Sequence, residues 1–410
     1  MTTPSSTSTG HPDNNTGTRV GALSYRQVLA LFLGGAIALQ VAQGLVYQRR
    51  ITPYKVSYWL VTYEHGFVRR GLAGEVLRRV AGTAPSLVTI EAVQYLLTAA
   101  LLAALCLLVR ALWQRNDPSL DLAAIVLCCS PFVFDFVAFQ RRPDQIGYLV
   151  VLAIGFMLWK RPTSSTVTTL VGGLLLAVAV LVSDSAFLAC TGWAAVLVVL
   201  APGQSIRSLR TLVRLALLTV PPAAMALVSA TAGRLDDTHV QALAATASRY
   251  RWTDVVVFPY LADSLQTSLH RVADMPLTMM LGSVLVGGFL VLLQGWLMTG
   301  LGSPQSVASR RPQRTTVLVV GLCAVGLVVL LCLGIDWFRW ISGFGLMATV
   351  AFAFSRLMRK PTTSVASGGY PPRGVIVVSA YLLAVAAFPN MISVSEGFLQ
   401  LLLAYNSAKP

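Results

Sequence analysis

The residues best suited to chemistry lie between the first two apolar segments, where a carboxylate and an imidazole precede two adjacent arginines. Glu64 and His65 are followed by Arg69 and Arg70. A carboxylate can take a proton from a hydroxyl group. Arginines hold phosphate through paired N–H donors and neutralise charge that develops on a leaving group. The pattern predicts a site for an anionic, lipid-borne ligand. The alternative is a helix capped by Glu64 whose arginines contact lipid headgroups.

Two short turns between later apolar segments carry similar residue types. The first contains Arg141, Arg142 and Asp144, with Pro143 suited to the first position of a helix and Asp144 to its first turn. Those preferences explain the aspartate but not two adjacent arginines, so the turn is a second candidate for phosphate binding. The second turn carries Asp184 between two serines. A carboxylate between two apolar runs is costly unless it is hydrated or paired, which makes Asp184 a candidate for substrate binding.

A fourth candidate follows the ninth apolar segment. Asp336 and Arg339 are three residues apart, a spacing that lets them pair on a helix. Trp337 and Trp340 beside them suit an aromatic belt at a membrane interface. They suit stacking on a sugar ring equally well.

The elements that position these residues are predicted to be membrane spans. The chain has 410 residues, of which 55% are hydrophobic and only 11% are charged, and its mean hydropathy is +0.70. A soluble chain carries about 25% charged residues. The net charge of +15 therefore reflects membrane topology and does not indicate nucleic-acid binding.

A membrane span needs about 20 apolar residues, and the sequence offers about eleven such stretches. They predict an all-α, polytopic bundle formed by a single transmembrane domain over residues 25–410, after a disordered cytoplasmic tail at residues 1–24. The fourth to sixth stretches are short and separated by few residues, so two of them could be re-entrant segments that do not cross the whole membrane. The candidates are 28–47, 92–113, 122–139, 144–159, 167–183, 186–202, 212–231, 277–299, 315–334, 340–357 and 374–390.

Basic residues in the short loops favour a cytoplasmic N-terminus. On that topology the acidic residues gather on the external side, apart from Asp13, Asp117, Asp121 and Asp135. The long external loops are 48–91 and 232–276. In the first, apolar residues recur at helical spacing and predict an amphipathic interfacial helix at 66–80.

The apolar residues of that predicted helix are Phe67, Val68, Leu72, Ala73, Val76, Leu77 and Val80, with Arg69, Arg70, Glu75, Arg78 and Arg79 on the opposite face. Gly71 and Gly74 are expected to let a headgroup or a neighbouring helix come close. The loop 232–276 is predicted to contain helices near 240–249 and 254–271. It is interpreted as an interfacial anchor, or as a lid or platform for an acceptor.

Several common motifs are absent from the sequence. It contains no GxxxxGK[ST] or GxGxxG phosphate loop, no G-x-S-x-G elbow and no HExxH zinc motif. The chain also lacks a soluble domain able to hold a sugar nucleotide. A membrane enzyme of this kind needs a donor that the membrane itself delivers, and a polyprenyl-phosphate-linked sugar meets that need.

The chain resembles GT-C type glycosyltransferases and their poorly characterised bacterial relatives associated with polysaccharide synthesis. The matching segments are Phe67-Val68-Arg69-Arg70-Gly71-Leu72, Arg142-Pro143-Asp144 and Asp336-Trp337-Phe338-Arg339-Trp340. The resemblance implies a helical bundle, an amphipathic helix after the first span and a catalytic carboxylate in the first external loop. That carboxylate is Glu64. The first span has no aspartate near its end and no paired acidic motif follows it, so Asp144 is the second candidate.

These observations predict an inverting glycosyltransferase in the bacterial plasma membrane with its active face outside the cytoplasm. It would move a sugar from a polyprenyl-phosphate donor to a glycan or glycolipid acceptor, with no nucleic-acid partner. No cofactor is assigned, and the sequence leaves a divalent metal open. The alternatives are a lipid-linked polysaccharide polymerase or ligase, and a flippase for polyprenyl-linked glycans. The predicted roles are general base for Glu64 or Asp144; donor phosphate binding for Arg69, Arg70, Arg141, Arg142 and Arg339; and substrate binding for His65, Asp184, Asp336, Trp337 and Trp340.

Overall fold

The structure is a computed structural model of the whole chain. It describes most of residues 56–358 and a few positions between 27 and 38. The gaps within 56–358 are residues 65, 84, 116, 129, 135–141, 162–164, 203, 205–206, 249, 251–257, 301–313 and 335–336. The predicted tail at residues 1–24 and the predicted span at 374–390 lie outside the described residues.

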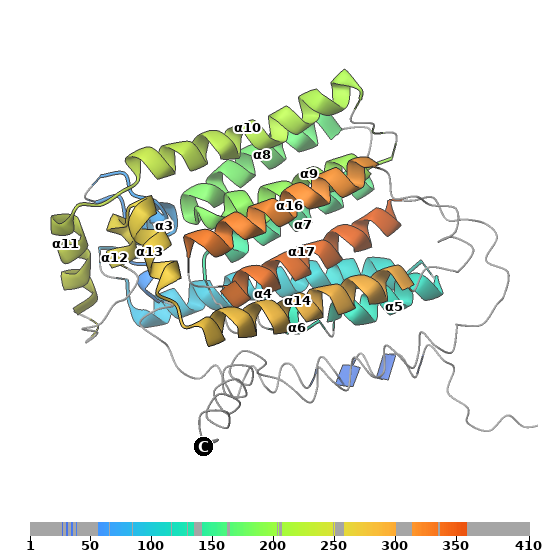
Figure 1. Cartoon of the computed structure of the whole chain (residues 1–410), viewed down its shortest axis with the longest axis horizontal. Coiled ribbons are helices and arrows are strands. Elements are labelled where there is room, and N and C mark those ends of the chain that lie inside the picture. The colour runs from blue at the N-terminus through green and yellow to red at the C-terminus, as the bar shows by residue number, and fades with distance from the viewer. Residues whose placement is uncertain are drawn as a thin grey trace, which may run out of the picture.

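Throughout the described ranges the regular secondary structure is helical, which agrees with the all-α prediction. Long helices run side by side across the molecule, and shorter helices gather at one end of them (Figure 1). The long or apolar helices are α4 (Leu87–Trp113), α5 (Pro118–Cys128), α6 (Pro131–Phe134), α7 (Gln145–Lys160), α8 (Ser165–Val182), the π-helical turn η3 (Phe187–Thr191), α9 (Gly192–Leu200), α10 (Leu209–Ala232), α14 (Leu277–Gly300), α16 (Arg314–Leu333) and α17 (Trp337–Leu357).

The predicted spans from 92–113 through 340–357 each contain a described helix. Within the described residues, three helices are long and apolar enough to cross a membrane: Leu87–Trp113, Leu209–Ala232 and Arg339–Leu357. The other apolar helices have apolar parts of 10–17 residues, which is less than a full span needs, and they include the three that were predicted to be short. The predicted span at 122–139 is interrupted, because α5 ends at Cys128 and α6 begins at Pro131.

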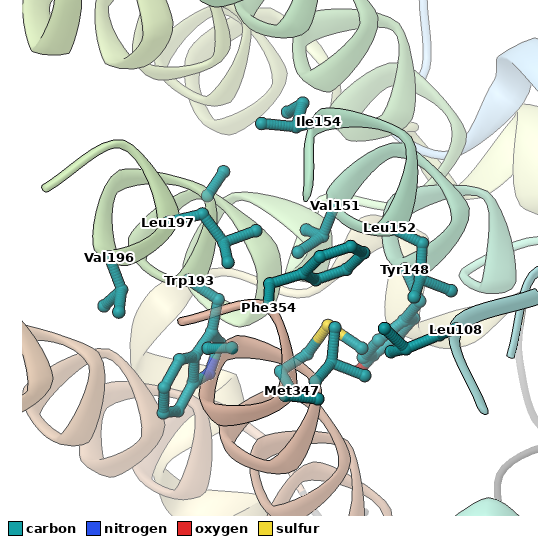
Figure 2. Packing of buried hydrophobic residues seen from close by; sticks show 14 of the residues in the cluster. Leu108, Tyr148, Val151, Leu152, Ile154, Trp193, Val196, Leu197, Met347 and Phe354 are labelled. Carbon is teal, nitrogen blue, oxygen red and sulfur yellow. The ribbon is translucent and has the colours of Figure 1, made fainter. Parts of the chain in front are cut away.

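The interior of the bundle is a single apolar core. Side chains from α4, α7, α9 and α17 meet there, among them Leu108, Val151, Trp193 and Phe354 (Figure 2). Helix α8 lies along α10. At their contact a Cβ on Gly173 would overlap the carbonyl oxygen of Leu217, so the absence of a side chain lets the two backbones approach closely.

A second, smaller core lies at the end of the bundle where the short helices gather. We call this region the cap; it comprises the described parts of residues 56–81 and 234–276. Its helices are α3 (Gly71–Ala81), α11 (Asp237–Ser248), α12 (Pro259–Ala262) and α13 (Leu265–Ala273), seen at the left of Figure 1. Apolar residues from both chain segments form its interior, including Trp59, Leu77, Leu243 and Phe258. The two predicted external loops therefore fold together.

The predicted interfacial helix is corrected in both its start and its faces. It begins at Gly71 and not at residue 66, because Gly66 and Arg70 have positive φ angles of 108° and 66° that interrupt a helix. Glu75 is buried, whereas Val76 and Val80 on the predicted apolar face are exposed. The helix turns its small residues and Glu75 toward the rest of the cap, and its valines outward.

The glycines and the second long loop are also corrected. Gly74 packs against the backbone of Val61, where any Cβ would overlap the carbonyl oxygen, and Gly71 packs against Tyr63. These glycines admit the chain's own residues 59–63 and not a headgroup. In the loop 232–276 the predicted helix at 254–271 is two helices, because the chain turns at Asp263 and Ser264 between α12 and α13.

Candidate functional site

Arg70 stands where the cap meets the bundle. It precedes α3 at the N-cap position, but its side chain makes no capping hydrogen bond. Instead its Nε–H group donates to the Oδ1 atom of Asp184 at 2.7 Å, across 114 positions of sequence. Arg70 is the one described non-glycine residue with a positive φ. Such backbone outliers cost free energy and cluster at functional sites.

Asp184 lies in the short connection between α8 and the π-helical turn. Its Oδ1 atom also accepts the backbone N–H of Ser185 at 2.9 Å. Burial opposes ionisation of this carboxyl, but Arg70 and Arg69 outweigh burial and hold its pKa below the usual range. Asp184 is therefore an anion beside at least one arginine, as its sequence position between two apolar runs required.

A second ionic group, which we call the triad, lies in the bundle beside this pair. Its members are Arg142, Asp144 and Arg339. The Nη1 atom of Arg339 donates to Oδ2 of Asp144 at 3.0 Å, and Nε of Arg142 lies 3.8 Å from Oδ1. Asp144 thus joins the N-terminal ends of α7 and α17. Asp144 occupies the N-cap position of α7, but its side chain makes no capping hydrogen bond there. The helix begins at Gln145, two residues after the predicted start at Pro143.

Tyr58, which sequence reasoning did not single out, connects the pair to the triad. The guanidinium carbon of Arg142 lies 3.8 Å from the centre of its ring, and that of Arg70 lies 6.0 Å from the same point. Both distances fall within the range of a cation–π interaction. In the sequence, Tyr58 is marked only by its position in an aromatic stretch that follows the first apolar segment. Aromatic residues are common at membrane interfaces, so this position alone did not indicate a functional role.

Arg69 ties the same corner to the second part of the cap. Its backbone N–H donates to the carbonyl oxygen of Gly233 at 2.9 Å. Burial lowers the pKa of its side chain, and Asp184 and Asp263 act in the opposite direction. Asp263 in turn pairs with Arg271 at 2.6 Å. Arginines from two distant segments therefore surround one corner of the bundle.

The two groups differ in exposure. The side chains of Arg70 and Asp184 are 22% and 27% exposed. Those of Arg142 and Asp144 are 2% and 9% exposed, and Arg339 is 7% exposed. The Arg70–Asp184 pair is thus partly exposed, whereas the triad is buried.

Glu64 and Glu75 contribute to a separate part of the cap. Glu64 is exposed and acts electrostatically on Arg78, whose pKa is raised chiefly by the hydrogen bond that Arg78 donates to Glu75. Arg78 and Arg79 both donate to Glu75, at 2.8 and 2.7 Å. These bonds, with a backbone N–H bond from Tyr63 and against the cost of burial, lower the pKa of Glu75 to about 2.

Of the two tryptophans in the fourth candidate, Trp340 packs beside Arg339 in α17. Trp340 is buried, with the guanidinium carbon of Arg339 5.6 Å from its ring centre. It therefore supports Arg339 and presents no open face to a sugar; Trp337 is half-buried. The expected partner of Arg339 was Asp336, but the partner observed is Asp144. His65, Arg141 and Asp336 lie outside the described residues.

The described part of the chain holds no group of three or more His, Cys, Asp or Glu side chains placed to bind a metal ion. What the corner does hold is arginine: Arg69, Arg70, Arg142 and Arg339 against the carboxylates of Asp144 and Asp184 among the described residues. Chemically, such a corner suits an anion, and its accessible part is the Arg70–Asp184 pair.

Comparison with known proteins places the chain in a family. The pattern of the uncharacterised membrane protein Rv1490 family matches residues 30–249, more than half of the 410 residues. The chain belongs to the Rv1490 family. The matched region of this Rv1490-family protein contains Tyr58, Arg70, Arg142, Asp144 and Asp184 but ends before Arg339. Family membership and the apolar helices make it a membrane protein with bacterial relatives.

The individual relatives of this Rv1490-family chain are similar over a shorter region. The uncharacterized protein Rv1490 of Mycobacterium tuberculosis is 28% identical over 137 residues, covering 32% of this chain and 31% of the relative. The uncharacterized protein Mb1527 of Mycobacterium bovis has the same identity and coverage. The match thus spans 31% of the length of these curated relatives. No solved structure matches the chain.

Proposed function

We propose that this protein is an integral membrane glycosyltransferase. It moves a sugar from a polyprenyl-phosphate-linked donor to a cell-envelope glycan or lipid acceptor on the extracytoplasmic side. The observation that carries the proposal is the accessible Arg70–Asp184 pair, placed at one end of an apolar bundle beside the buried triad. The same proposal includes a GT-C-like arrangement of about eleven spans, the number set by span length.

The physical support comes from where the charges lie. An arginine-rich corner at one end of a membrane bundle suits the phosphate of a lipid whose chain stays in the bilayer. Arg70 would contact that phosphate, because its guanidinium is accessible, and Arg69 would add positive charge beside it. When the bond to the sugar breaks, the polyprenyl phosphate leaves with extra negative charge. Arginines already in place stabilise that charge without reorganisation.

The position of the site also favours transfer over transport. A transporter binds its cargo near the bilayer midplane, between repeated halves. Here the accessible charges lie at the cap end of the helices, and the described interior between α4, α7, α9 and α17 is filled with apolar side chains.

The test uses the full-length protein reconstituted in lipid nanodiscs. It is mixed with bacterial lipid extracts that carry radiolabelled polyprenyl-phosphate sugars, and with envelope glycan fractions as acceptors. We expect label in the acceptor and release of polyprenyl phosphate. Arg70→Ala should lower the transfer rate at least about 100-fold, the size of effect seen when a charge-stabilising group is lost.

The matched control is Arg79→Ala, which removes an arginine of the same cap whose side chain is 77% exposed. It should transfer at the rate of the unaltered protein. If no donor and acceptor fraction yields product, or if both variants transfer normally, the proposed function is wrong. A ladder of products in place of a single addition would assign a polymerase.

A further inference from the structure

Among the ionic contacts that the structure describes in the site, the Arg70–Asp184 contact is the one in which both side chains are partly exposed. It uses the Nε–H group of Arg70, one of five N–H donors on a guanidinium. Both side chains are partly exposed, whereas the members of the triad are buried. A phosphate group that bound the edge of the guanidinium carrying this Nε–H would meet the Asp184 carboxylate there, so the two anions would compete for that edge of Arg70.

We propose that the donor phosphate displaces Asp184 from Arg70, and that the freed Asp184 carboxylate then acts as the general base for the acceptor hydroxyl. This inference rests on the proposed function and adds a base and an order of binding to it. The donor must bind first, because the base becomes available only when the donor phosphate holds Arg70.

The transfer step follows from this exchange. The acceptor oxygen forms a bond to the anomeric carbon of the sugar while its proton passes to an Oδ atom of Asp184. The bond between the anomeric carbon and the phosphate oxygen breaks, and its electron pair leaves on the polyprenyl phosphate. Arg70 and Arg69 stabilise that product. The proton is released to solvent when polyprenyl phosphate departs and Arg70 returns to Asp184.

The geometry favours Asp184 over the two carboxylates that the sequence suggested. Asp144 has an arginine at each oxygen and is 9% exposed, so an acceptor hydroxyl cannot reach it in this conformation. Glu64 is exposed and acts electrostatically on Arg78, and no hydrogen bond or ion pair in the described residues joins its carboxylate to an arginine of the site. Among the carboxylates that the structure describes at this corner, Asp184 is the one that combines partial exposure with direct contact to a proposed phosphate-binding arginine.

Two further observations support an exchange. The backbone of Arg70 is held in the left-handed region, with φ 66° and ψ 12°, a conformation that the surrounding cap must impose. In addition, the pKa of Asp184 is held low by Arg70 and Arg69 despite burial. Neutralising Arg70 with a phosphate removes part of that effect and makes the carboxylate a better proton acceptor.

The experiment compares Asp184→Asn with the unaltered protein in nanodiscs. Farnesyl phosphate is the binding probe, and inorganic phosphate and phosphatidylglycerol show whether recognition needs the lipid-borne phosphomonoester. We expect Asp184→Asn to bind farnesyl phosphate about 3- to 10-fold more tightly, because the internal competitor for Arg70 is gone. The same variant should lose sugar transfer by at least about 100-fold, the usual contribution of a general base.

The matched control is Asp236→Asn, which alters an aspartate of the cap that is 60% exposed and pairs with His239. It should leave both binding and transfer unchanged. Asp184→Glu retains a carboxylate, so it should keep measurable transfer and should not gain affinity. This second variant also carries the test if Asp184→Asn does not fold.

The outcomes distinguish failure of the proposed role of Asp184 from failure of the proposed glycosyltransferase function. If Asp184→Asn transfers sugar at the normal rate, Asp184 is not the base, although the glycosyltransferase proposal stands. Unchanged or weaker binding of farnesyl phosphate by Asp184→Asn overturns the competition for Arg70. If the unaltered protein binds farnesyl phosphate but transfers no sugar with any donor, the proposed function falls and the base role falls with it.

Discussion

Two ionic groups meet at Tyr58 and differ in almost every physical respect. The Arg70–Asp184 pair joins the cap to the bundle and is partly exposed. The triad of Arg142, Asp144 and Arg339 joins two helices of the bundle and is buried. Both combine the same residue types, and in the sequence both appeared as candidates for one phosphate site.

The difference in exposure between the two groups indicates that burial decides whether an ion pair can exchange partners with a ligand. Charges taken out of water must keep their partners, because a lone buried charge costs several kcal/mol, on the order of the total stability of many proteins. The triad is therefore a fixed structural element whose arginines cannot leave Asp144. A partly exposed pair has little free energy to lose, so it can exchange partners with a ligand.

The largest expected effect comes from breaking the triad. Asp144→Asn removes the carboxylate that compensates two buried arginines, and it should lower the free energy of unfolding by about 3–5 kcal/mol. Asp184→Asn should lower it by no more than about 1 kcal/mol. Thermal unfolding of both variants in the same detergent measures the contrast. Equal losses in the free energy of unfolding would show that the buried triad contributes no more to stability than the partly exposed Arg70–Asp184 pair.

A smaller effect is expected where the two groups meet. Tyr58→Leu keeps an apolar side chain but removes the ring beside Arg142, which should cost about 2 kcal/mol, the value of a desolvated cation–π interaction. Tyr58→Phe keeps the ring and serves as the control. The unfolding midpoints of the two variants test this. A leucine variant as stable as the phenylalanine variant would show that the ring of Tyr58 does not stabilise the fold through Arg142.

Arg70 should matter for ligand binding far more than for folding. Arg70→Ala breaks a partly exposed pair, so the free energy of unfolding should fall by no more than about 1 kcal/mol, while farnesyl phosphate binding is lost. Arg79→Ala in the same cap should leave farnesyl phosphate binding unchanged and lower the free energy of unfolding by no more than about 0.5 kcal/mol, the value of an i,i+4 pair on a helix. Binding isotherms and thermal melts on the same preparations check both halves. A large loss of stability in Arg70→Ala would make the pair structural, like the triad.

The smallest effect concerns acid and the separate ionic contacts of α3. Glu75 has a folded pKa of about 2, below its ordinary 4.5. Its contacts with Arg78 and Arg79 therefore stabilise α3 fully above about pH 4.5, and this contribution disappears as the pH falls toward 2. Hydrogen exchange of a peptide covering residues 71–81 should show faster opening at low pH. In Glu75→Gln that pH dependence should be weaker; an unchanged profile would contradict the assignment.

Much of the architecture could be predicted because a membrane span can be recognised from the length and composition of one local stretch of sequence. The stretches from 92–113 to 340–357 could be found from apolar length alone, and each contains a helix. The start of α3 was harder to predict. Residues 67–70 have helical apolar spacing, but Arg70 is held in a left-handed conformation and the backbone of Arg69 is bonded to Gly233. A contact across 164 positions cannot be seen in a local pattern.

The candidate site was predictable as a set of residues but not as a set of partners. Arg70, Asp144, Asp184 and Arg339 were all singled out by sequence. The one partner expected from spacing was a near neighbour, Asp336 for Arg339, because short-range pairing is all that spacing can suggest. The observed partners of Arg70 and Arg339 are Asp184 and Asp144. Tyr58 escaped notice because an aromatic residue near a membrane interface is ordinary.

The sequence by itself determined that this is a helical membrane protein and which polar residues interrupt its apolar segments. The reason is that water-to-lipid transfer depends on residue type and length, which are local properties. Only the tertiary structure decided which carboxylate meets which arginine, and which of these pairs is open to a ligand. Both depend on how the cap, folded from segments more than 150 residues apart, closes over the end of the bundle.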